Sequence, residues 1–203
     1  MSAPCFCDYA TIGVSGPAQR DIWIEPFVAP DYQNDLELRY KHARGVAEDE
    51  IPDKWAGHTS AEPVLPLPHF CSFGFWLISA RAADVFSRHD LSGGRIQPIQ
   101  VYQHDRVTPV AGQTFILVPG LDHKTFDAAQ SILREDEFSP GVYLPSWSPK
   151  DEEIVVPETG LPDSDLWVDS RLRGVFFVSA RLAGALNEAG VAEPFDLIQT
   201  RLI

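Results

Sequence analysis

The sequence predicts an α+β fold with a mixed β-sheet and a few short helices. The main observation is a repeated pattern: residues 76–86 (WLISARAADVF) and residues 176–186 (FFVSARLAGAL) both place S-A-R-x-A after a run of bulky apolar residues. Runs typical of strands also outnumber helical patterns along the chain. The 17 prolines and 14 glycines indicate many turns and argue against long uninterrupted helices.

Each copy of this pattern predicts a strand, a serine cap, a short helix and a following strand. Phe75–Ile78 and Val175–Val178 are continuous apolar runs rich in aromatic and β-branched residues, which favours buried strands. Ser79 and Ser179 follow these runs. Serine is a good N-cap because its hydroxyl accepts a hydrogen bond from a backbone N–H two or three residues on. We therefore expect both serines to be structural N-caps rather than nucleophiles.

The remaining elements follow from shorter local patterns. Residues 31–45 predict a short polar helix, and alternating prolines in residues 61–70 predict an extended stretch. Residues 126–133 place apolar side chains at helical spacing, but polar residues interrupt them, so helix and loop both stay open. Gly190 predicts a left-handed helix end. Further strands are expected over residues 12–16, 21–28, 95–103, 114–120, 152–158 and 194–202.

The length of 203 residues allows one domain with a sizeable hydrophobic core. We expect residues 1–203 to form a single domain, with an irregular N-terminal part over residues 1–60 and an α+β core over residues 65–203. No apolar run approaches the length of a membrane span, and the first residues lack the pattern of a secretory signal. These features predict a cytoplasmic protein with no membrane partner.

The charge distribution bears on the kind of partner. A net charge of −13 argues against a nucleic-acid-binding protein, since phosphate contacts need a basic face. Residues 121–170 alone hold 12 acidic and 3 basic residues. This concentration indicates either a solvated face or a surface that attracts a basic protein partner. The candidate partner-binding residues are Glu135, Asp136, Glu137, Asp151, Glu152 and Glu153.

No arrangement of residues is typical of an enzyme or a metal site. Neither capping serine belongs to a G-x-S-x-G or S-x-x-K motif, and the six histidines are scattered without metal-ligand spacing. His69 and Cys71 could face the same way as a base and a thiol, but a buried thiol beside a surface histidine is the favoured interpretation. Arg81 and Arg181 oppose the dipole of their helices unless an acidic neighbour or a partner recruits them. We therefore expect no catalytic residue, cofactor, metal or disulfide.

The C-terminal pattern LWVDSRLRGVFFVSARLAGALNEAGVAEPFDLI (166–198) resembles the end of a bacterial immunity-protein family of polymorphic toxin systems. FWLISARAADVF with IQPIQV resembles the family's first strand–Ser–helix unit, and FDAAQS, with Asp127 and Ser131, resembles its central D-x-x-x-S. The resemblance covers roughly residues 65–203. The chain departs from the family pattern at Glu193-Pro194, where a small residue is usual.

This resemblance implies a non-enzymatic protein that binds and neutralises a cognate protein toxin, and it supplies no active site to carry over. A second hypothesis is a small-ligand-binding or regulatory module without catalysis. A third is an enzyme such as a Cys/His hydrolase. Rescue of growth from a toxic neighbouring gene would favour the first hypothesis, and a thermal shift with a metabolite would favour the second.

Overall fold

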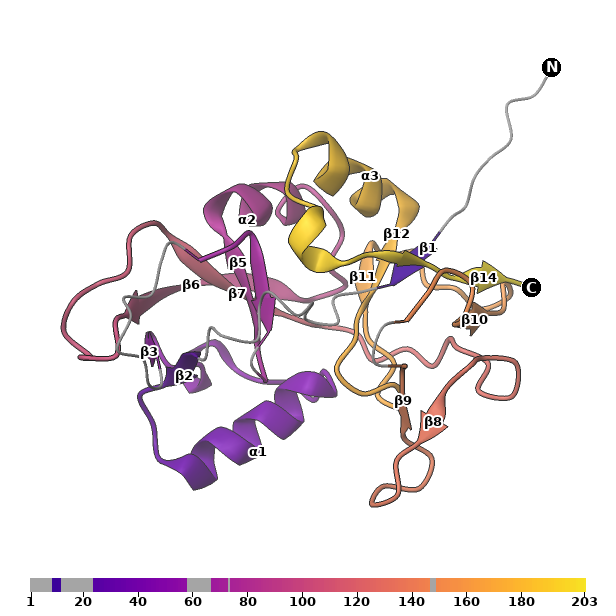
Figure 1. The fold of residues 1–203 in the computed structure, drawn as a ribbon, viewed down its shortest axis with the longest axis horizontal. Helices are drawn as coiled ribbons and strands as arrows, with labels where there is room; N and C mark the ends of the chain where they lie inside the picture. Colours follow the sequence, from indigo (N-terminus) through magenta and orange to yellow (C-terminus); the bar gives the residue numbers. More distant parts are fainter. Residues whose placement is uncertain (1–8, 12–23, 58–66, 73, 147–148) are drawn as a thin grey trace.

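The computed structural model confirms the α+β fold, and it describes residues 9–11, 24–57, 67–72, 74–146 and 149–203. The largest sheet has six strands in the order β2-β3-β6-β7-β5-β4 (Figure 1). The sheet is mixed: β3 and β6 pair in parallel, whereas every other pair of neighbouring strands in this sheet is antiparallel. The strands are β2 (Ile24–Pro26), β3 (Lys54–Gly57), β4 (Phe70–Ser72), β5 (Trp76–Ser79), β6 (Arg95–Tyr102) and β7 (Thr114–Val118).

A second, antiparallel sheet has four strands in the order β11-β12-β1-β13. Two short ribbons accompany it: β10 pairs with β14 in parallel, and β8 pairs with β9 in an antiparallel hairpin that projects from the body of the protein (Figure 1). The strands are β1 (Tyr9–Thr11), β8 (Arg134–Glu135), β9 (Tyr143–Leu144), β10 (Val155–Val156), β11 (Leu166–Trp167), β12 (Phe177–Ser179), β13 (Ile198–Gln199) and β14 (Arg201–Leu202).

The helices are short, as the prolines and glycines predict. The repeated pattern forms α2 (Ala80–Phe86) and α3 (Ala180–Glu188), and the predicted polar helix is α1 (Pro30–Lys41). Glu48–Glu50 (η2) is a short 3-10 helix. No helix among the described residues combines the length and the apolar character needed to cross a membrane.

The end of α3 confirms the prediction made from Gly190. This glycine has a φ of 65°, and its N–H donates to the Asn187 carbonyl at 2.9 Å. The N–H of Val191 donates to the Leu186 carbonyl at 3.0 Å. These two hydrogen bonds form a Schellman motif, which satisfies carbonyl groups that the helix leaves free.

The predicted strand over residues 194–202 is wrong as one element. Glu193–Phe195 is a 3-10 helix (η3), and Asp196 follows in the left-handed region with a φ of 50°. A proline without a backbone N–H sits in the first turn of η3, and it could not have paired within a central strand. Only the two short strands β13 and β14 remain extended.

Residues 126–133, which the sequence left between helix and loop, form a turn. Asp127 Oδ1 accepts the N–H of Ala129 at 2.9 Å. Ser131 Oγ donates to the Asp127 carbonyl at 2.6 Å and accepts the N–H of Val155 at 2.9 Å. The D-x-x-x-S motif therefore fastens a turn to β10. The predicted strand over residues 12–16 and residues 61–66 of the proline-rich stretch lie outside the described residues.

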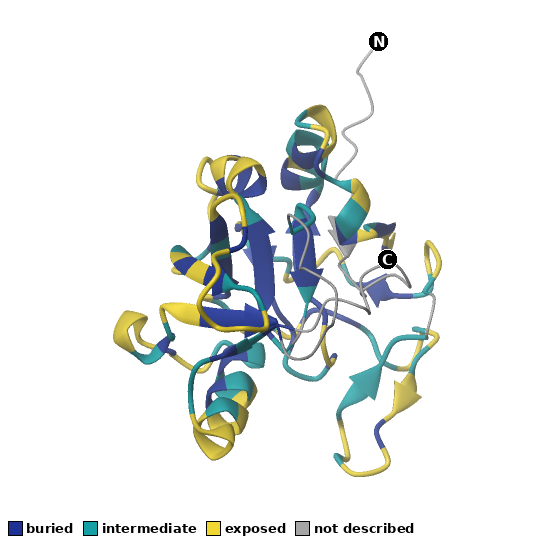
Figure 2. Ribbon diagram, turned by 60° about the vertical axis from the view of Figure 1, so that its left-hand side comes forward, coloured by how far each residue is buried: buried dark blue, intermediate teal, exposed yellow. Residues whose placement is uncertain are grey.

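Two hydrophobic cores lie on either side of β12, and Figure 2 shows the buried residues concentrated in the strands. Phe176, just before β12, belongs to the larger core with Trp76, whose ring centroid is 4.7 Å away. Phe177 belongs to the smaller core and stacks on Trp167 at 5.4 Å. Consecutive side chains of an extended chain point to opposite faces, so this apolar run fills both cores.

Candidate functional site

The two serines of the repeated pattern are helix N-caps. Ser79 Oγ accepts the N–H of Ala82 at 3.3 Å, and Ser179 Oγ accepts the N–H of Leu182 at 3.1 Å. Both serines have extended backbone geometry, as an N-cap residue requires. Their hydroxyl groups are thus engaged with the first turns of α2 and α3, as the sequence predicts.

A histidine also contacts the first of these serines. His69 Nδ1 lies 2.8 Å from Ser79 Oγ. A Ser–His pair acts as a nucleophile when a third group orients the histidine and oxyanion donors face the reaction centre. Among the described contacts of the His69 ring, Ser79 is the partner and no third group orients the ring. Cys71 is buried, and burial raises the pKa of its thiol to about 12, so the thiol is protonated at neutral pH. The favoured interpretation of Cys71 as a buried thiol is confirmed.

Asp165, which the sequence analysis did not single out, joins the two repeated units. Its Oδ1 accepts hydrogen bonds from the Ser179 hydroxyl and from Arg181 Nε at 3.0 Å. Its Oδ2 lies 2.8 Å from Arg181 Nη2, 3.1 Å from His89 Nδ1 and 3.0 Å from the backbone nitrogen of Asp90. His89 and Asp90 follow α2, whereas Ser179 and Arg181 begin α3. One buried carboxylate therefore connects the end of the first unit to the start of the second.

The arrangement around Asp165 differs from that of a catalytic triad. Burial raises the pKa of this carboxyl, but the hydrogen bonds from Arg181 and Ser179 outweigh burial and hold the pKa at about 2. In a catalytic triad the histidine lies between serine and aspartate and takes the proton of the serine. Here the aspartate lies between Ser179 and His89, so the group that accepts the Ser179 hydroxyl is a carboxylate of low pKa, a weak base, in place of a histidine. The one sequence signal was Arg181, whose unfavourable place at a helix start left an acidic neighbour as one of its explanations.

Arg81, the counterpart of Arg181 in the first unit, has a different environment. Its side chain is exposed, and its Nη2 comes near Gly190 at the C-terminal end of α3. A cation at that end of a helix is favourable, because the helix dipole places partial negative charge there. The two arginines therefore differ: Arg181 pairs with the buried Asp165, whereas Arg81 lies exposed near the end of α3.

The first acidic cluster lies on the β8–β9 hairpin. Glu135 is exposed on β8, and its Oε1 accepts the N–H of Gly141 at 2.7 Å. Asp136 is only 6% exposed and forms an ion pair with Arg173 at 2.6 Å. Glu137 is exposed. The structure therefore places Glu135 and Glu137 on the surface of the hairpin, whereas Asp136 is buried and paired with Arg173.

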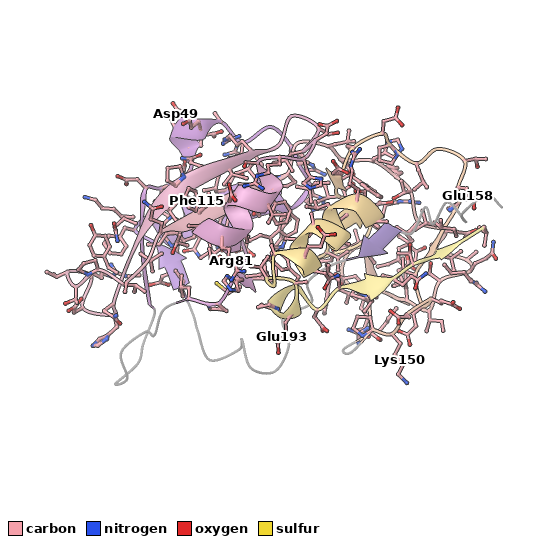
Figure 3. The ribbon with its side chains drawn as sticks, turned by 90° about the horizontal axis from the view of Figure 1, so that it is seen from above. Asp49, Arg81, Phe115, Lys150, Glu158 and Glu193 are labelled. Carbon is pink, nitrogen blue, oxygen red and sulfur yellow. The ribbon has the colours of Figure 1, made fainter. Side chains whose placement is uncertain are left out.

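The second acidic cluster lies beside the hairpin. Asp151 Oδ1 accepts the N–H of Gln199 at 2.8 Å, and Glu153 Oε2 accepts the Ser146 hydroxyl at 3.0 Å. Glu152 is exposed. The Glu153 carbonyl accepts the N–H of Ile132 at 2.7 Å, two residues before β8 begins. This hydrogen bond places the second cluster next to the segment that leads into β8, which carries the first cluster. Lys150, which precedes the second cluster, points away from the body of the protein (Figure 3).

A large apolar side chain is exposed directly after Glu137. Phe138 is 92% exposed and lies in the loop that connects β8 to β9. Ile132, at the approach to the same hairpin, is 65% exposed. Figure 2 shows exposed residues at the tip of this projecting hairpin. We name the set the hairpin surface; it consists of Ile132, Glu135, Glu137, Phe138 and Glu152.

A small pocket of about 250 Å³ lies between α1 and residues 170–174. Asn34, Lys41, His42 and Arg173 line it, together with Glu37, which pairs with Lys41. The buried Nδ1 of His42 has no hydrogen-bond partner among the described residues. Burial and the nearby charge of Arg44 lower the pKa of His42, which favours a neutral imidazole. This pocket is the place for a small ligand under the second hypothesis, although sites for drug-sized ligands usually occupy about 300–1,000 Å³.

Within the described part of the chain, no group of three or more His, Cys, Asp or Glu side chains is placed to hold a metal ion. In comparisons with known proteins, no protein-family model matches the chain and no characterised protein matches it in sequence. The resemblance to immunity proteins therefore stays a hypothesis that depends on the residues of this chain alone.

Proposed function

We propose that this protein is a non-enzymatic immunity-type protein, which binds a cognate bacterial protein toxin and neutralises it. The observation that carries the proposal is the hairpin surface, where the exposed Phe138 directly follows the exposed Glu137 and lies in the same hairpin as the exposed Glu135. Interfaces combine an apolar centre with a polar rim, and charge of one sign speeds the encounter with a partner of the opposite sign.

The described side chains that resemble catalytic groups have structural roles. Ser79 and Ser179 cap helices, Asp165 connects the two repeated units, and Cys71 is a protonated, buried thiol. Neutralisation by binding needs none of these groups to react. A binding protein is therefore the simplest function for this arrangement, and it agrees with the function that the family resemblance implies.

Co-expression in a bacterial host tests the proposal. The product of the neighbouring gene, expressed alone, should arrest growth, and co-expression of this chain should restore it. A co-expressed unrelated acidic protein of similar size is the control. Arrest that persists in the presence of this chain would contradict the proposal.

The pocket beside α1 favours a second candidate function, a small-ligand-binding module. Lys41, His42 and Arg173 offer hydrogen-bond donors there, and the unpartnered Nδ1 of His42 offers a site for one more hydrogen bond. A rise in melting temperature with a small polar metabolite, absent in His42→Ala, would favour this function. No shift across a broad metabolite panel would count against it.

A further inference from the structure

We propose that Phe138 is the apolar anchor of this protein, and that it enters an apolar pocket rimmed by Lys and Arg side chains on a protein partner. The inference rests on the proposed function and specifies which part of the hairpin surface makes the central contact. The partner is recognised by its chemistry: a basic surface with a hole large enough for a phenyl ring.

The exposure of Phe138 is the first argument. Water reaches 92% of this side chain, although Phe is among the residues most often buried in folded proteins. A phenyl ring held in water contributes nothing to folding, but it becomes favourable when a partner covers it. Aromatic residues are enriched at the centres of protein interfaces.

The loop that carries Phe138 is held in place without it. Asp136 Oδ1 accepts the N–H of Phe138 at 2.9 Å, and the Asp136 carbonyl accepts the N–H of Ser139 at 3.2 Å. The Ser139 carbonyl in turn accepts the N–H of Val142 at 3.0 Å. These contacts fix the backbone on both sides of the ring. A partner would therefore lose little conformational entropy in ordering this loop, which favours affinity.

Side chains from outside the loop add to this support. Arg173 reaches it with two nitrogens: Nη1 lies 2.6 Å from Asp136 Oδ2, and Nη2 donates to Ser139 Oγ at 3.2 Å. Glu135 Oε1 accepts the N–H of Gly141, whose φ of 80° suits a tight turn. The hairpin tip is thus a pre-formed projection with an apolar end.

The charges around the ring decide the kind of partner. Glu135 at the end of β8 and Glu137 in the loop precede the ring, and Glu152 lies on the neighbouring segment. The bases beside the loop are Arg134 on β8 and the half-exposed Arg173. A basic rim around the partner's pocket would complement these acids and raise the association rate at low salt. A second copy of this chain is disfavoured as the partner, because each copy carries a net charge of −13.

The chain contains a matched control for Phe138. Val107 is 76% exposed in the β6–β7 connection, at the opposite end of the molecule (Figure 1). Its N–H donates to Asp105 Oδ1 at 2.9 Å, the same local contact that Asp136 makes with Phe138. Both residues are exposed apolar side chains two positions after an aspartate. They differ in side-chain size, since only Phe138 has a ring, and in the acidic residues near them.

The experiment measures the dissociation constant for the purified protein encoded by the neighbouring gene. We expect Phe138→Ala to weaken binding about 30-fold or more, which corresponds to about 2 kcal/mol. Phe138→Tyr should keep most of the affinity, and Val107→Ala should change it by less than about twofold. Glu135→Gln with Glu137→Gln should slow association at low salt and have less effect at high salt. Melting temperatures equal to wild type would show that each variant is folded.

The outcomes distinguish a failure of the proposed Phe138 anchor from a failure of the proposed function. If wild type binds and Phe138→Ala binds equally well, the anchor is refuted and the proposed function stands. If wild type does not bind this probe, both are refuted. If wild type forms a dimer that Phe138→Ala dissolves, the ring contacts a second copy and the basic partner is refuted.

Discussion

Replacing Asp165 by asparagine should destabilise the protein by about 3 kcal/mol. The amide keeps the size of the carboxylate but has no charge, and its single oxygen can accept about two hydrogen bonds. The other hydrogen bonds, from Arg181, Ser179, His89 or the Asp90 backbone, would lose their acceptor. Breaking a buried charged pair typically costs about 3–5 kcal/mol. The lower end applies here because Arg181 is 70% exposed and water can replace its partner.

Urea unfolding followed by tryptophan fluorescence measures this loss directly, with thermal unfolding as a second readout. For a chain of this size, about 3 kcal/mol corresponds to a fall in melting temperature of about 6–12 °C. Asp163→Asn is the matched control, because Asp163 is exposed on the same loop; it should change stability by less than about 0.5 kcal/mol. Equal stabilities for the two variants would refute the role of Asp165 as the connection between the repeated units.

Three further predictions follow from the same contacts. Ser79→Ala and Ser179→Ala should each lower stability by about 0.5–2 kcal/mol without loss of toxin neutralisation, and an unchanged unfolding midpoint in urea would contradict the capping role. The pKa of Asp165 falls from 3.8 to about 2 on folding, so its contribution is present above pH 3.8 and is lost as the pH falls towards 2. After allowance for solvent screening at Arg181, this loss of stability in wild type is on the order of 1 kcal/mol. The Asp165→Asn variant should lack this part of the acid dependence, and an equal loss of stability in the variant would contradict the prediction. Cys71, buried with a pKa of about 12, should react with a maleimide only after unfolding, and rapid modification of the native protein would contradict its burial.

The parts of the fold that depend on neighbouring residues could be predicted from the sequence. A serine cap needs only the N–H groups of the next turn, and the left-handed Gly190 needs only the end of its own helix. The continuous apolar run before Ser179 predicted a buried strand, and Phe176 and Phe177 indeed face two cores. In each case, the residues that determine the structure lie within a few positions of one another.

The parts that depend on distant residues could not be predicted. Asp165 and His89 are 76 residues apart, and no local pattern indicates that they meet. The sequence treats Glu135, Asp136 and Glu137 as one acidic run, but Arg173 draws the middle residue inside and leaves its neighbours on the surface. This division determines which acids of the first cluster are free to face a partner. The exposure of Phe138 could not be predicted either, because the residue type alone does not distinguish an exposed phenylalanine from one in the core.

The most direct test of the account is a titration of the toxin encoded by the neighbouring gene with this protein, followed by the toxin's own activity. Neutralisation by binding predicts that activity falls in proportion to the added protein and reaches its minimum near one equivalent, with intact toxin recovered from the complex. Complete loss of activity at a small fraction of an equivalent would indicate catalytic inactivation. That result, or full activity at a large excess, would contradict the proposal that this protein acts as a binding protein.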